Sequence, residues 1–369
     1  MSRASSIDAL RSKIDRIDER LLALLNRRAR LAIEVGRCKS DSGRSLYAPE
    51  REKRILERLG RLNRGPLKSD GIRTIFREIM SSCLALEKPL QIAFLGPPGT
   101  FSEQAARDQF GSRAELLPFG SIDAVFDEVE RGRTDYGVVP VENSTEGVVA
   151  QTLDRFVASP LTIMAEVLLR IEHCLLSREA RPRLLRRIVS HPQSLAQCRG
   201  WLAQHYPGVP TAEVGSNAVA AALAAREPRT AAIAGRSAAA RYGLRIVAAG
   251  IQDQPNNFTR FVVIGRDSRS DPTGDDKTSV LFSVPHQPGA LHQVLQPFAR
   301  HRINLTTIES RPLKGRPWEY VFFLDLSGHT AEPSMTKALA ALRRRARFFK
   351  VLGSYPAWRW PEAEERHER

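Results

Sequence analysis

The sequence lacks the signatures of several large protein classes. Its four cysteines include no C-x-x-C pair and its eight histidines no H-E-x-x-H motif, so neither a structural zinc site nor a disulfide framework is expected. No apolar run approaches the roughly 18 residues of a membrane-spanning helix, and the first stretch, MSRASSIDALRSK, lacks the apolar core of a signal peptide. We therefore expect a cytoplasmic protein without a membrane partner.

Nucleotide-binding motifs are missing as well. The stretch GPPGTFSE, residues 96–103, leaves a predicted strand and enters a predicted helix, where backbone N–H groups can bind an anion. A P-loop needs Gly-Lys-Ser/Thr and a dinucleotide fingerprint needs G-x-G-x-x-G, and this turn has neither. The hydroxyls of Thr100 and Ser102 suit a carboxylate instead.

Acidic residues are scarce relative to basic ones. The net charge is +15, and residues 1–89 alone carry 21 Lys and Arg against 12 Asp and Glu. A basic segment of this kind attracts small anions or binds nucleic acid. An arginine-rich composition without functional meaning is the alternative.

Residues 7–87 have the apolar periodicity of helices. In the first helix, residues 7–39, apolar side chains recur at three- and four-residue intervals, as in a coiled coil. They are Ile7, Leu10, Ile14, Ile17, Leu21, Leu24, Leu31 and Val35. This helix would be about 50 Å long, too long for a compact monomer, so its apolar seam predicts a dimer. Two further helices are expected at 51–62 and 70–87.

One position of this seam holds a cation, Arg28. A buried unpaired cation is costly, so Arg28 implies either a salt bridge to Glu52 or Asp18 or an anionic ligand. Lys39 lies three turns further along the same face. Arg11 is about 25 Å away along the helix and can reach such a pocket only from a second subunit.

The motifs of this segment resemble the all-helical chorismate mutase domain, an intertwined homodimer. They are Leu10-Arg11, Leu21-Leu-x-Leu-Leu25, Arg28, Val35-Gly36-x-x-Lys39 and Arg51-Glu52. The resemblance implies that Arg11 of one subunit, with Arg28, Lys39 and Arg51 of the other, binds the two carboxylates and the ether oxygen of chorismate. Preorganised cations favour the compact, charge-separated transition state of this pericyclic rearrangement. Glu52 opens the second helix beside Arg51 and is a further catalytic candidate.

Three positions depart from the common pattern of that family. Ala48 replaces a frequent Asp, which puts a contact to a substrate hydroxyl in doubt, and Cys83 replaces a frequent Ser. Glu87 stands where a Gln often faces the ether oxygen, and a Glu can donate that hydrogen bond only when protonated. An exposed Glu at a helix end is the alternative for Glu87.

Residues 90–267 alternate between apolar strands and helical stretches. Strands are expected at 91–95, 136–141, 161–169, 187–190, 231–234 and 258–264, an order that predicts an α/β fold with a largely parallel sheet. Helical stretches at 194–204 and 216–226 indicate a second lobe. Polar clusters follow two strands, at 142–144 and 190–193, where open α/β sheets bind ligands. Ordinary turns and a non-catalytic binding protein are the alternatives.

Four motifs in this order resemble prephenate dehydratase, which has two lobes of periplasmic-binding-protein type with the site between them. They are GPPGTFS, VPVENSTEG, SHPQ…QC and NNFTRF. The resemblance implies that Thr259 is the catalytic hydroxyl and that Arg260 pairs with a carboxylate. The other substrate-binding candidates are Thr100, Phe101, Ser102, Asn143, Ser144, Ser190, Gln193 and Gln197. Loss of a ring hydroxyl and CO2 aromatises prephenate to phenylpyruvate, so the reaction needs a proton donor and no metal or cofactor.

After a polar linker at 266–277 the pattern predicts a ferredoxin-like βαββαβ unit. Strands are expected at 278–284, 305–310, 320–326 and 348–352, helices at 290–301 and 334–345, and a disordered tail at 361–369. The GAL and ESRP motifs resemble the ACT regulatory domain, which implies L-phenylalanine binding between two ACT units and feedback inhibition. The implied allosteric residues are Gly289, Ala290, Leu291, Asn304, Glu309, Ser310, Arg311 and Pro312. An ordinary domain in which Gly289 only makes a turn is the alternative.

In combination, the three segments resemble the bifunctional chorismate mutase–prephenate dehydratases. We expect an all-α mutase domain at 1–89, an α/β dehydratase domain at 90–267 and an α+β ACT domain at 277–355. The expected assembly is a homodimer or a higher homo-oligomer that binds no nucleic acid. Two alternatives are a non-enzymatic amino-acid sensor built on a solute-binding fold and a nucleic-acid-binding coiled coil.

Overall fold

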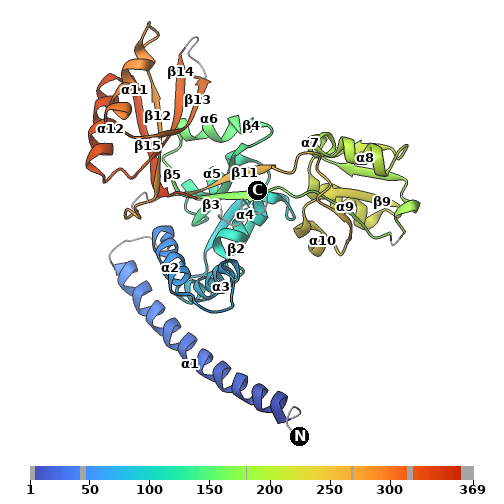
Figure 1. Cartoon of the computed structure of the whole chain (residues 1–369). Coiled ribbons are helices and arrows are strands. Elements are labelled where there is room, and N and C mark those ends of the chain that lie inside the picture. The colour runs from blue at the N-terminus through green and yellow to red at the C-terminus, as the bar shows by residue number, and fades with distance from the viewer. Residues whose placement is uncertain (1–4, 42–46, 180, 267–269, 314–318, 359–369) are drawn as a thin grey trace, which may run out of the picture. The chain divides into compact units, whose positions relative to one another are not determined.

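The structure of the protein is a computed structural model that describes residues 5–41, 47–179, 181–266, 270–313 and 319–358 (Figure 1). Contacts divide the chain into two compact units. The first comprises Met1–Ala48, Arg54–Leu90 and Phe110–Glu115, and the second comprises Pro49–Lys53, Gln91–Gln109 and Leu116–Arg369. Among the described residues, no helix combines the length and the apolar character needed to cross a membrane.

The first unit is helical, as predicted. Its elements are α1 (Ser5–Asp41), most of α2 (Pro49–Leu62) and α3 (Ser69–Glu87), and α1 packs against α3. The apolar seam of α1 is exposed in the single chain, with Ile14 at 55% and Leu21 at 50% exposure. An apolar stripe of this length is typical of a helix that another helix covers. The dimer stays a prediction.

The first sheet of the second unit forms lobe 1, with strand order β2-β1-β3-β11-β5 and β4 paired to β3. Its strands are β1 (Gln91–Leu95), β2 (Glu115–Phe119), β3 (Tyr136–Asn143), β4 (Gly147–Val148), β5 (Thr162–Arg170) and β11 (Phe258–Gly265), and its helices are α4 (Phe101–Phe110), α5 (Ile122–Glu130) and α6 (Ala150–Ala158). The helices α5 and α6 pack on β3 and on each other. Because β3 and β11 are buried on both faces, both strands are nearly continuous apolar runs.

The second sheet forms lobe 2, with strand order β10-β6-β9-β7-β8. Its elements are β6 (Cys174–Ser177), η1 (Pro182–Leu184), β7 (Arg187–Ser190), α7 (Pro192–Gln197), α8 (Arg199–His205), β8 (Thr211–Glu213), α9 (Asn217–Arg226), β9 (Thr230–Ala234), α10 (Arg236–Tyr242) and β10 (Arg245–Ala249). The alanine-rich α9 packs closely on β9, and the expected second lobe is present. The helix expected at 194–204 is divided at Cys198 into α7 and α8.

The prediction of a largely parallel sheet is wrong. The strand β11 runs antiparallel to both of its neighbours, β3 and β5, in the middle of lobe 1. In lobe 2, β6 is antiparallel to both β9 and β10. An apolar strand buried on both faces carries no sign of its direction, which is set here by the return of the chain from lobe 2 into lobe 1.

The two segments that connect the lobes are hydrogen-bonded to each other. Ile171 N donates to Asn257 O at 2.8 Å, and Ile251 N donates to His173 O at 3.0 Å. His173 N also donates to the side-chain oxygen of Gln252 at 3.0 Å. The residues just before β11 are therefore held against the residues just after β5.

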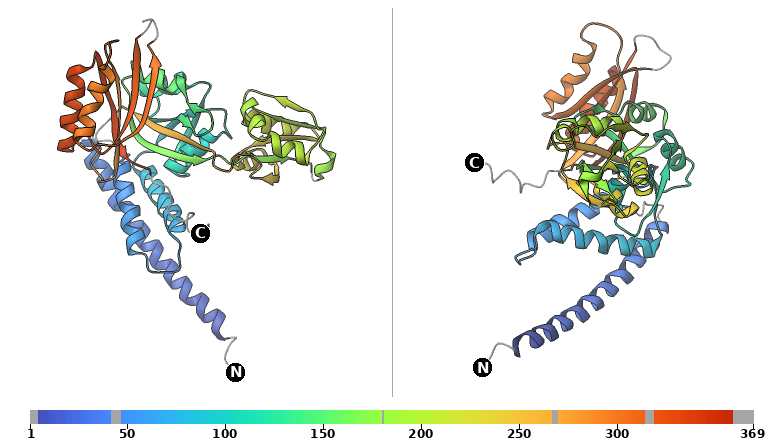
Figure 2. Two further views of the ribbon diagram at one scale, coloured as in Figure 1. Left: turned by 45° about the horizontal axis from the view of Figure 1, so that its top comes forward. Right: turned by 90° about the vertical axis from the view of Figure 1, so that its right-hand side faces the viewer.

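The C-terminal domain has the predicted βαββαβ order. Its antiparallel sheet has the order β13-β14-β12-β15, formed by β12 (Asp276–Ser283), β13 (Leu305–Pro312), β14 (Tyr320–Ser327) and β15 (Phe348–Pro356). The helices α11 (Ala290–Arg300) and α12 (Pro333–Arg345) cover one face of this sheet (Figures 1 and 2). Phe282 and Leu324 of the sheet pack against Val294 and Phe298 of α11 there.

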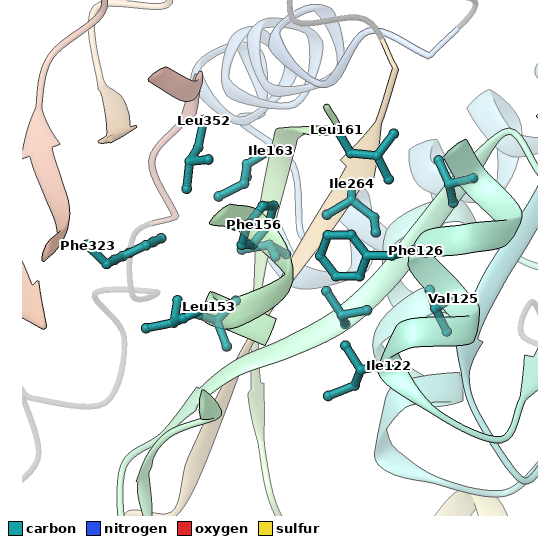
Figure 3. Packing of buried hydrophobic residues seen from close by; sticks show 14 of the residues in the cluster. Ile122, Val125, Phe126, Leu153, Phe156, Leu161, Ile163, Ile264, Phe323 and Leu352 are labelled. Atoms are coloured by element: carbon teal, nitrogen blue, oxygen red, sulfur yellow. The ribbon is translucent and has the colours of Figure 1, made fainter. Parts of the chain in front are cut away.

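The other face of this sheet shares a hydrophobic core with lobe 1. Phe323 and Leu352 of the C-terminal domain belong to the same buried cluster as Leu153, Phe156 and Ile163 of lobe 1 (Figure 3). These side chains are almost fully buried. The removal of these apolar side chains from water stabilises the contact between lobe 1 and the C-terminal domain.

A glycine allows the backbones of β15 and β5 to approach closely. Gly353 has a φ of +151°, and a Cβ atom built on it would lie 2.3 Å from the carbonyl oxygen of Ile163. Real Cβ atoms do not approach a backbone oxygen to this distance, so any other residue would push the two strands apart.

We predict that Gly353→Ala lowers stability by about 3 kcal/mol, because overpacking against a backbone and an unfavourable φ act together. Thermal unfolding of the full chain measures the effect. The control is Gly274→Ala, where φ is also positive, at +86°, but no atom lies within 4 Å of the new Cβ, so only the conformational cost of about 1 kcal/mol is expected. Equal changes in Tm for the two variants would contradict the close contact.

Candidate active site

The strand pair β3–β11 brings two of the predicted residues together. Asn143 lies opposite Thr259 in the register of these strands, and its Nδ2 donates a hydrogen bond to Thr259 Oγ1 at 2.8 Å. Asn143 Oδ1 accepts hydrogen bonds from the backbone N–H groups of Thr145 and Glu146, at 3.0 and 3.1 Å. The following turn thus occupies the amide oxygen and directs the amide nitrogen of Asn143 at the Thr259 hydroxyl.

The Thr259 hydroxyl accepts a hydrogen bond and keeps its own proton available. Within the described part of the chain, no acceptor lies within hydrogen-bond distance of that proton. A hydroxyl oxygen that accepts from an amide is a better donor to a third group, because hydrogen bonds in a chain polarise one another. The geometry therefore suits donation of a hydrogen bond or a proton from Thr259 to a ligand.

A buried asparagine extends the network from lobe 1 to lobe 2. Asn257, 1% exposed, accepts from Asn143 Nδ2 at 2.9 Å and donates to Gln197 Oε1 at 3.0 Å. Gln197 ends α7 in lobe 2, and His173 Nε2 donates to the same oxygen at 2.9 Å. Two donors on one oxygen fix the orientation of the Gln197 amide, whose nitrogen lies 3.4 Å from Glu146 Oε1.

His173 is held neutral at this position. Burial lowers the pKa of His173, and the hydrogen bond to Gln197 opposes that effect only in part. Since an amide oxygen accepts and cannot donate, the imidazole proton is on Nε2. Across the described residues, no group of three or more His, Cys, Asp or Glu side chains is arranged to hold a metal ion.

Asn257 and His173 are not among the residues predicted from the sequence. The asparagine pair of NNFTRF was a usable signal for Asn257, because the predicted catalytic hydroxyl follows two residues later. The residues around His173 form no motif that predicts its contact with Gln197. That contact arises because the chain crosses between the lobes at His173.

Ser144 binds backbone groups at the entry to β11. Its hydroxyl donates to Asn256 O at 3.2 Å and accepts from Phe258 N at 2.9 Å, while its own N–H donates to Phe258 O at 2.8 Å. These contacts hold the segment that leads into Thr259. Ser144 therefore lies beside the network and contacts backbone atoms, not the side chains of Asn143, Asn257 or Thr259.

Ser190 lies apart from the Thr259 network. Its side chain is fully buried, and its hydroxyl lies 2.7 Å from Ile233 O and 3.1 Å from Asn217 Oδ1. Ser190 ends β7 two residues before α7 begins, so its hydrogen bonds help to fix the start of that helix. Gln193 lies one turn before Gln197 on the same face of α7.

The turn at 96–103 is occupied by a side chain of the protein itself. Gly99 N, one of the backbone donors of this turn, donates to Glu103 Oε2 at 2.5 Å, and the Thr100 hydroxyl donates to Leu95 O at 3.1 Å. Ser102 is buried. The expectation that this turn offers free donors to a ligand carboxylate is therefore corrected for Gly99, which already binds a carboxylate.

Phe101, the next residue, lies against the network. Its ring meets the His173 ring edge-on, with centroids 5.7 Å apart, and a Cβ atom on Gly235 would lie 2.9 Å from the Phe101 ring. Phe101 thus packs between His173 and the start of α10, and it shields the imidazole.

Arg260 is not positioned to bind a ligand beside Thr259. Successive side chains of a strand point to opposite faces, so Arg260 faces away from Thr259. It is 7% exposed, and its Nε and Nη1 donate to Glu166 Oε2 at 2.8 Å and Asp325 Oδ2 at 2.5 Å. Arg260 does pair with carboxylates, but they belong to the protein, and its assignment as a binder of a substrate carboxylate is corrected.

Four predicted residues of the helical unit lie together: Arg28, Lys39, Cys83 and Glu87. Arg28 Nη1 lies 2.9 Å from Cys83 Sγ, and the carboxyl group of Glu87 packs on Gly36, where a Cβ atom would lie 2.6 Å from Glu87 Oε2. Burial raises the pKa of Glu87, and the nearby Lys39 and Arg28 lower it less than burial raises it. Glu87 Oε2 is buried, so the alternative of a fully exposed Glu is excluded.

The remaining candidates of this segment lie elsewhere on the helices. Arg11 is near the start of α1, its side chain is 74% exposed, and its Nη1 lies 3.5 Å from Asp8 Oδ1. Arg51 and Glu52 are in the first turn of α2, and Ala48 precedes that helix without a side-chain cap. Their roles, and the second subunit that Arg11 requires, stay predictions. Between Arg28 and Asp18, both described, no ion pair is present.

Comparisons with known proteins match all three segments. Family models named chorismate mutase type II, prephenate dehydratase and ACT domain match residues 10–88, 92–269 and 278–344. The bifunctional chorismate mutase/prephenate dehydratase of Stutzerimonas stutzeri is 49% identical over 362 residues, covering 96% of this chain and 99% of the relative.

The chain belongs to the bifunctional chorismate mutase/prephenate dehydratase family. It is an enzyme with two catalytic domains and a C-terminal ACT domain, and the three expected fold types are confirmed.

Two solved structures each match nearly three quarters of the chain. The prephenate dehydratase of Arthrobacter aurescens, in complex with L-Phe, is 35% identical with a TM-score of 0.68 and covers 73% of this chain and 90% of its own. The quorum-quenching acylase GqqA is 31% identical with a TM-score of 0.66 and covers 73% of this chain and 98% of its own.

The predicted allosteric residues of the ACT domain lie on two faces of its sheet. Ser310 pairs with Phe322, which packs with the helices, and so lies on the same face as α11. Arg311 pairs with Val321 on the opposite face, where its Nε is 3.7 Å from Asp154 of α6 beside a cavity of about 230 Å³.

The other predicted allosteric residues divide in the same way. Glu309 pairs with Phe323 and shares the face of Arg311, whereas Gly289, Ala290 and Leu291 begin α11 on the helical side. Asn304 precedes β13, Pro312 is the last residue of β13 and pairs with Tyr320, and both are exposed. One pocket that contacts all eight residues from one side of the sheet is therefore incompatible with the register.

Proposed function

We propose that this enzyme rearranges chorismate to prephenate in its helical domain and converts prephenate to phenylpyruvate in its dehydratase domain. L-Phenylalanine inhibits the second reaction through the ACT domain. The observation that carries the dehydratase assignment is the Thr259 hydroxyl, which accepts from Asn143 and has its own proton free for a ligand.

Thr259 donates to the hydroxyl group that leaves the prephenate ring. Departure of hydroxide is unfavourable, so a proton or a hydrogen bond must stabilise the developing charge. The hydrogen bond from Asn143 makes the threonine hydroxyl a stronger donor. Asn257 and Gln197 keep Asn143 and the facing lobe in place, and ring aromatisation accompanies the loss of CO2.

We predict that Thr259→Ala lowers kcat for phenylpyruvate formation at least about 1,000-fold, because the donor to the leaving group is lost. Chorismate consumption by the same chain is the internal control and should stay within twofold of wild type. Thr259→Ser keeps the hydroxyl and should retain much of the activity. Full dehydratase activity in Thr259→Ala would refute the assignment.

Glu87 supports the mutase assignment in its protonated form. The ether oxygen of chorismate needs a donor, and a carboxyl group provides one only with its proton. Burial raises the pKa of Glu87, so the protonated form persists to higher pH than for an exposed Glu. Arg28 and Lys39, close to Glu87, supply positive charge for the substrate carboxylates.

The pH profile of the mutase tests this role. Mutase activity should fall as pH rises through the raised pKa of Glu87, because the donor loses its proton. Glu87→Gln donates at every pH and should remove this descending limb from a kcat/KM profile. Glu78→Gln, on the same helix but bonded to Ser112, is the control and should keep the limb. A limb that survives in Glu87→Gln would rule Glu87 out as the titrating donor.

The start of α11 supports binding of L-phenylalanine. Gly289 has a φ of +79°, and a Cβ atom on it would meet only Gln293 Nε2, in ordinary contact at 3.9 Å. A ligand can therefore approach this backbone closely, and the N-terminus of a helix favours a carboxylate. The related Arthrobacter aurescens structure, which contains L-Phe, supports the same class of effector.

We predict that Gly289→Ala raises the L-phenylalanine concentration for half-inhibition of the dehydratase at least about tenfold, because the new methyl group occupies the space of the ligand. Gly274→Ala, at a linker glycine that also has a positive φ and open surroundings, should leave inhibition unchanged. If both variants keep wild-type sensitivity, the effector binds elsewhere.

A further inference from the structure

A buried charge cluster connects the dehydratase strand β11 with three strands of the ACT domain. All three guanidinium nitrogens of Arg260 donate hydrogen bonds: Nε to Glu166 Oε2, Nη1 to Asp325 Oδ2 and Nη2 to Tyr355 OH, at 2.8, 2.5 and 2.9 Å. Lys277 donates to the same Glu166 oxygen at 2.8 Å. Two cations and two carboxylates thus balance within the cluster.

The ACT side of the cluster closes into a ring of hydrogen bonds. Tyr355 OH accepts from Arg260 and lies 2.6 Å from Ser279 Oγ, which donates to Asp325 Oδ1. Asp325 then accepts from Arg260 with its other oxygen. Ser279, Asp325 and Tyr355 are fully buried and come from β12, β14 and β15. The ACT sheet thereby fixes the guanidinium group in position and orientation.

Thr259 is the residue immediately before Arg260 on the same strand. Asn143 pairs with Thr259, and Glu142 pairs with Arg260, but the β3–β11 register is irregular directly after Arg260. On its other side β11 pairs regularly with β5 from Phe258 to Val263. The irregularity therefore weakens the hold on this strand end only on the β3 side, where side-chain contacts add to it. On the face opposite Thr259 the side-chain anchor of this strand end is Arg260, whose partners are Glu166 of lobe 1 and Asp325 and Tyr355 of the ACT domain.

We propose that Asp325 and Tyr355 of the ACT domain are positioning residues for the dehydratase reaction, which hold Arg260 and through it the strand end that carries Thr259. Arg260 then has a mechanical role next to the active site and does not touch the substrate. The ACT domain becomes a structural part of the dehydratase site as well as a regulatory module.

This proposal rests on the proposed role of Thr259. A misplacement of about 1 Å at a catalytic group can cost about 100-fold in rate. Loss of an anchor should therefore appear in kcat for phenylpyruvate formation. The KM for prephenate should change little, since neither Arg260 nor its partners contact the ligand.

Steady-state kinetics of full-length variants test the proposal. We expect Asp325→Asn to lower the dehydratase kcat about 10- to 100-fold and Tyr355→Phe about threefold to tenfold, with the KM for prephenate within threefold of wild type. Mutase activity, measured on the same samples, should remain within twofold. Circular dichroism at the assay temperature verifies that each variant is folded.

Lys350→Met is the matched control. Lys350 of β15 also joins the ACT domain to lobe 1, through hydrogen bonds from Nζ to the carbonyl oxygens of Phe156 and Ser159, but it lies away from β11. This variant should lose thermal stability and keep its dehydratase kcat. A merely structural role of Asp325 and Tyr355 predicts the same behaviour for all three variants.

The outcomes separate the possible failures. Wild-type kcat in folded Asp325→Asn and Tyr355→Phe overturns the positioning role, and so does an equal loss of kcat in Lys350→Met. If Asp325→Asn does not fold, Tyr355→Phe decides, because it removes one hydroxyl and no charge. Failure of the proposed function is a different result, namely full dehydratase activity in Thr259→Ala.

Discussion

The burial of Arg260 constrains the second unit more than any other single interaction described here. A guanidinium group that is only 7% exposed must find partners for its charge and its donors, and it finds them in Glu166 of lobe 1 and in Asp325 and Tyr355 of the ACT domain. Removal of either carboxylate leaves a charge uncompensated in the interior. The neighbouring apolar cluster of Phe156, Ile163, Phe323 and Leu352 supplies the hydrophobic stabilisation for the same contact.

The strand β11 connects this charge cluster with Thr259, the proposed catalytic residue of the dehydratase. One face of its first residues carries Thr259, which receives a hydrogen bond from Asn143, and the other carries Arg260. Its preceding residues include Asn257, which joins Asn143 to Gln197 of lobe 2. A single segment of four residues therefore meets both lobes and the ACT sheet. An open α/β fold places ligand groups at strand ends, and here one strand end is also where three parts of the chain meet.

Much of this organisation could be predicted from sequence, and the failures have physical causes. The three helices of the first unit, six of the eleven described strands of the two lobes and the βαββαβ unit followed from periodicity. The motifs identified Asn143, Gln197 and Thr259, which the structure connects. Strand direction could not be predicted, because β11 is apolar on both faces. Arg260 was assigned to a substrate carboxylate because it shares the NNFTRF motif with Thr259, whereas alternation along the strand turns its side chain to the opposite face. His173 and Asn257 acquire their contacts from the crossing between the lobes, which no local pattern encodes.

The close contact at Gly353 bears on how the chain can be divided. Family boundaries suggest a chain of exchangeable modules, with a cut possible in the linker before β12. A dehydratase ending at Gly265 would expose Ile163 and Phe156 to water and leave Arg260 and Glu166 without Asp325, Tyr355 and Lys277. The isolated piece would then expose an apolar surface, and Arg260 would keep only Glu166 of its three hydrogen-bond partners. Recombination between relatives should therefore exchange the dehydratase and ACT segments together, and separate them only where both surfaces change at once.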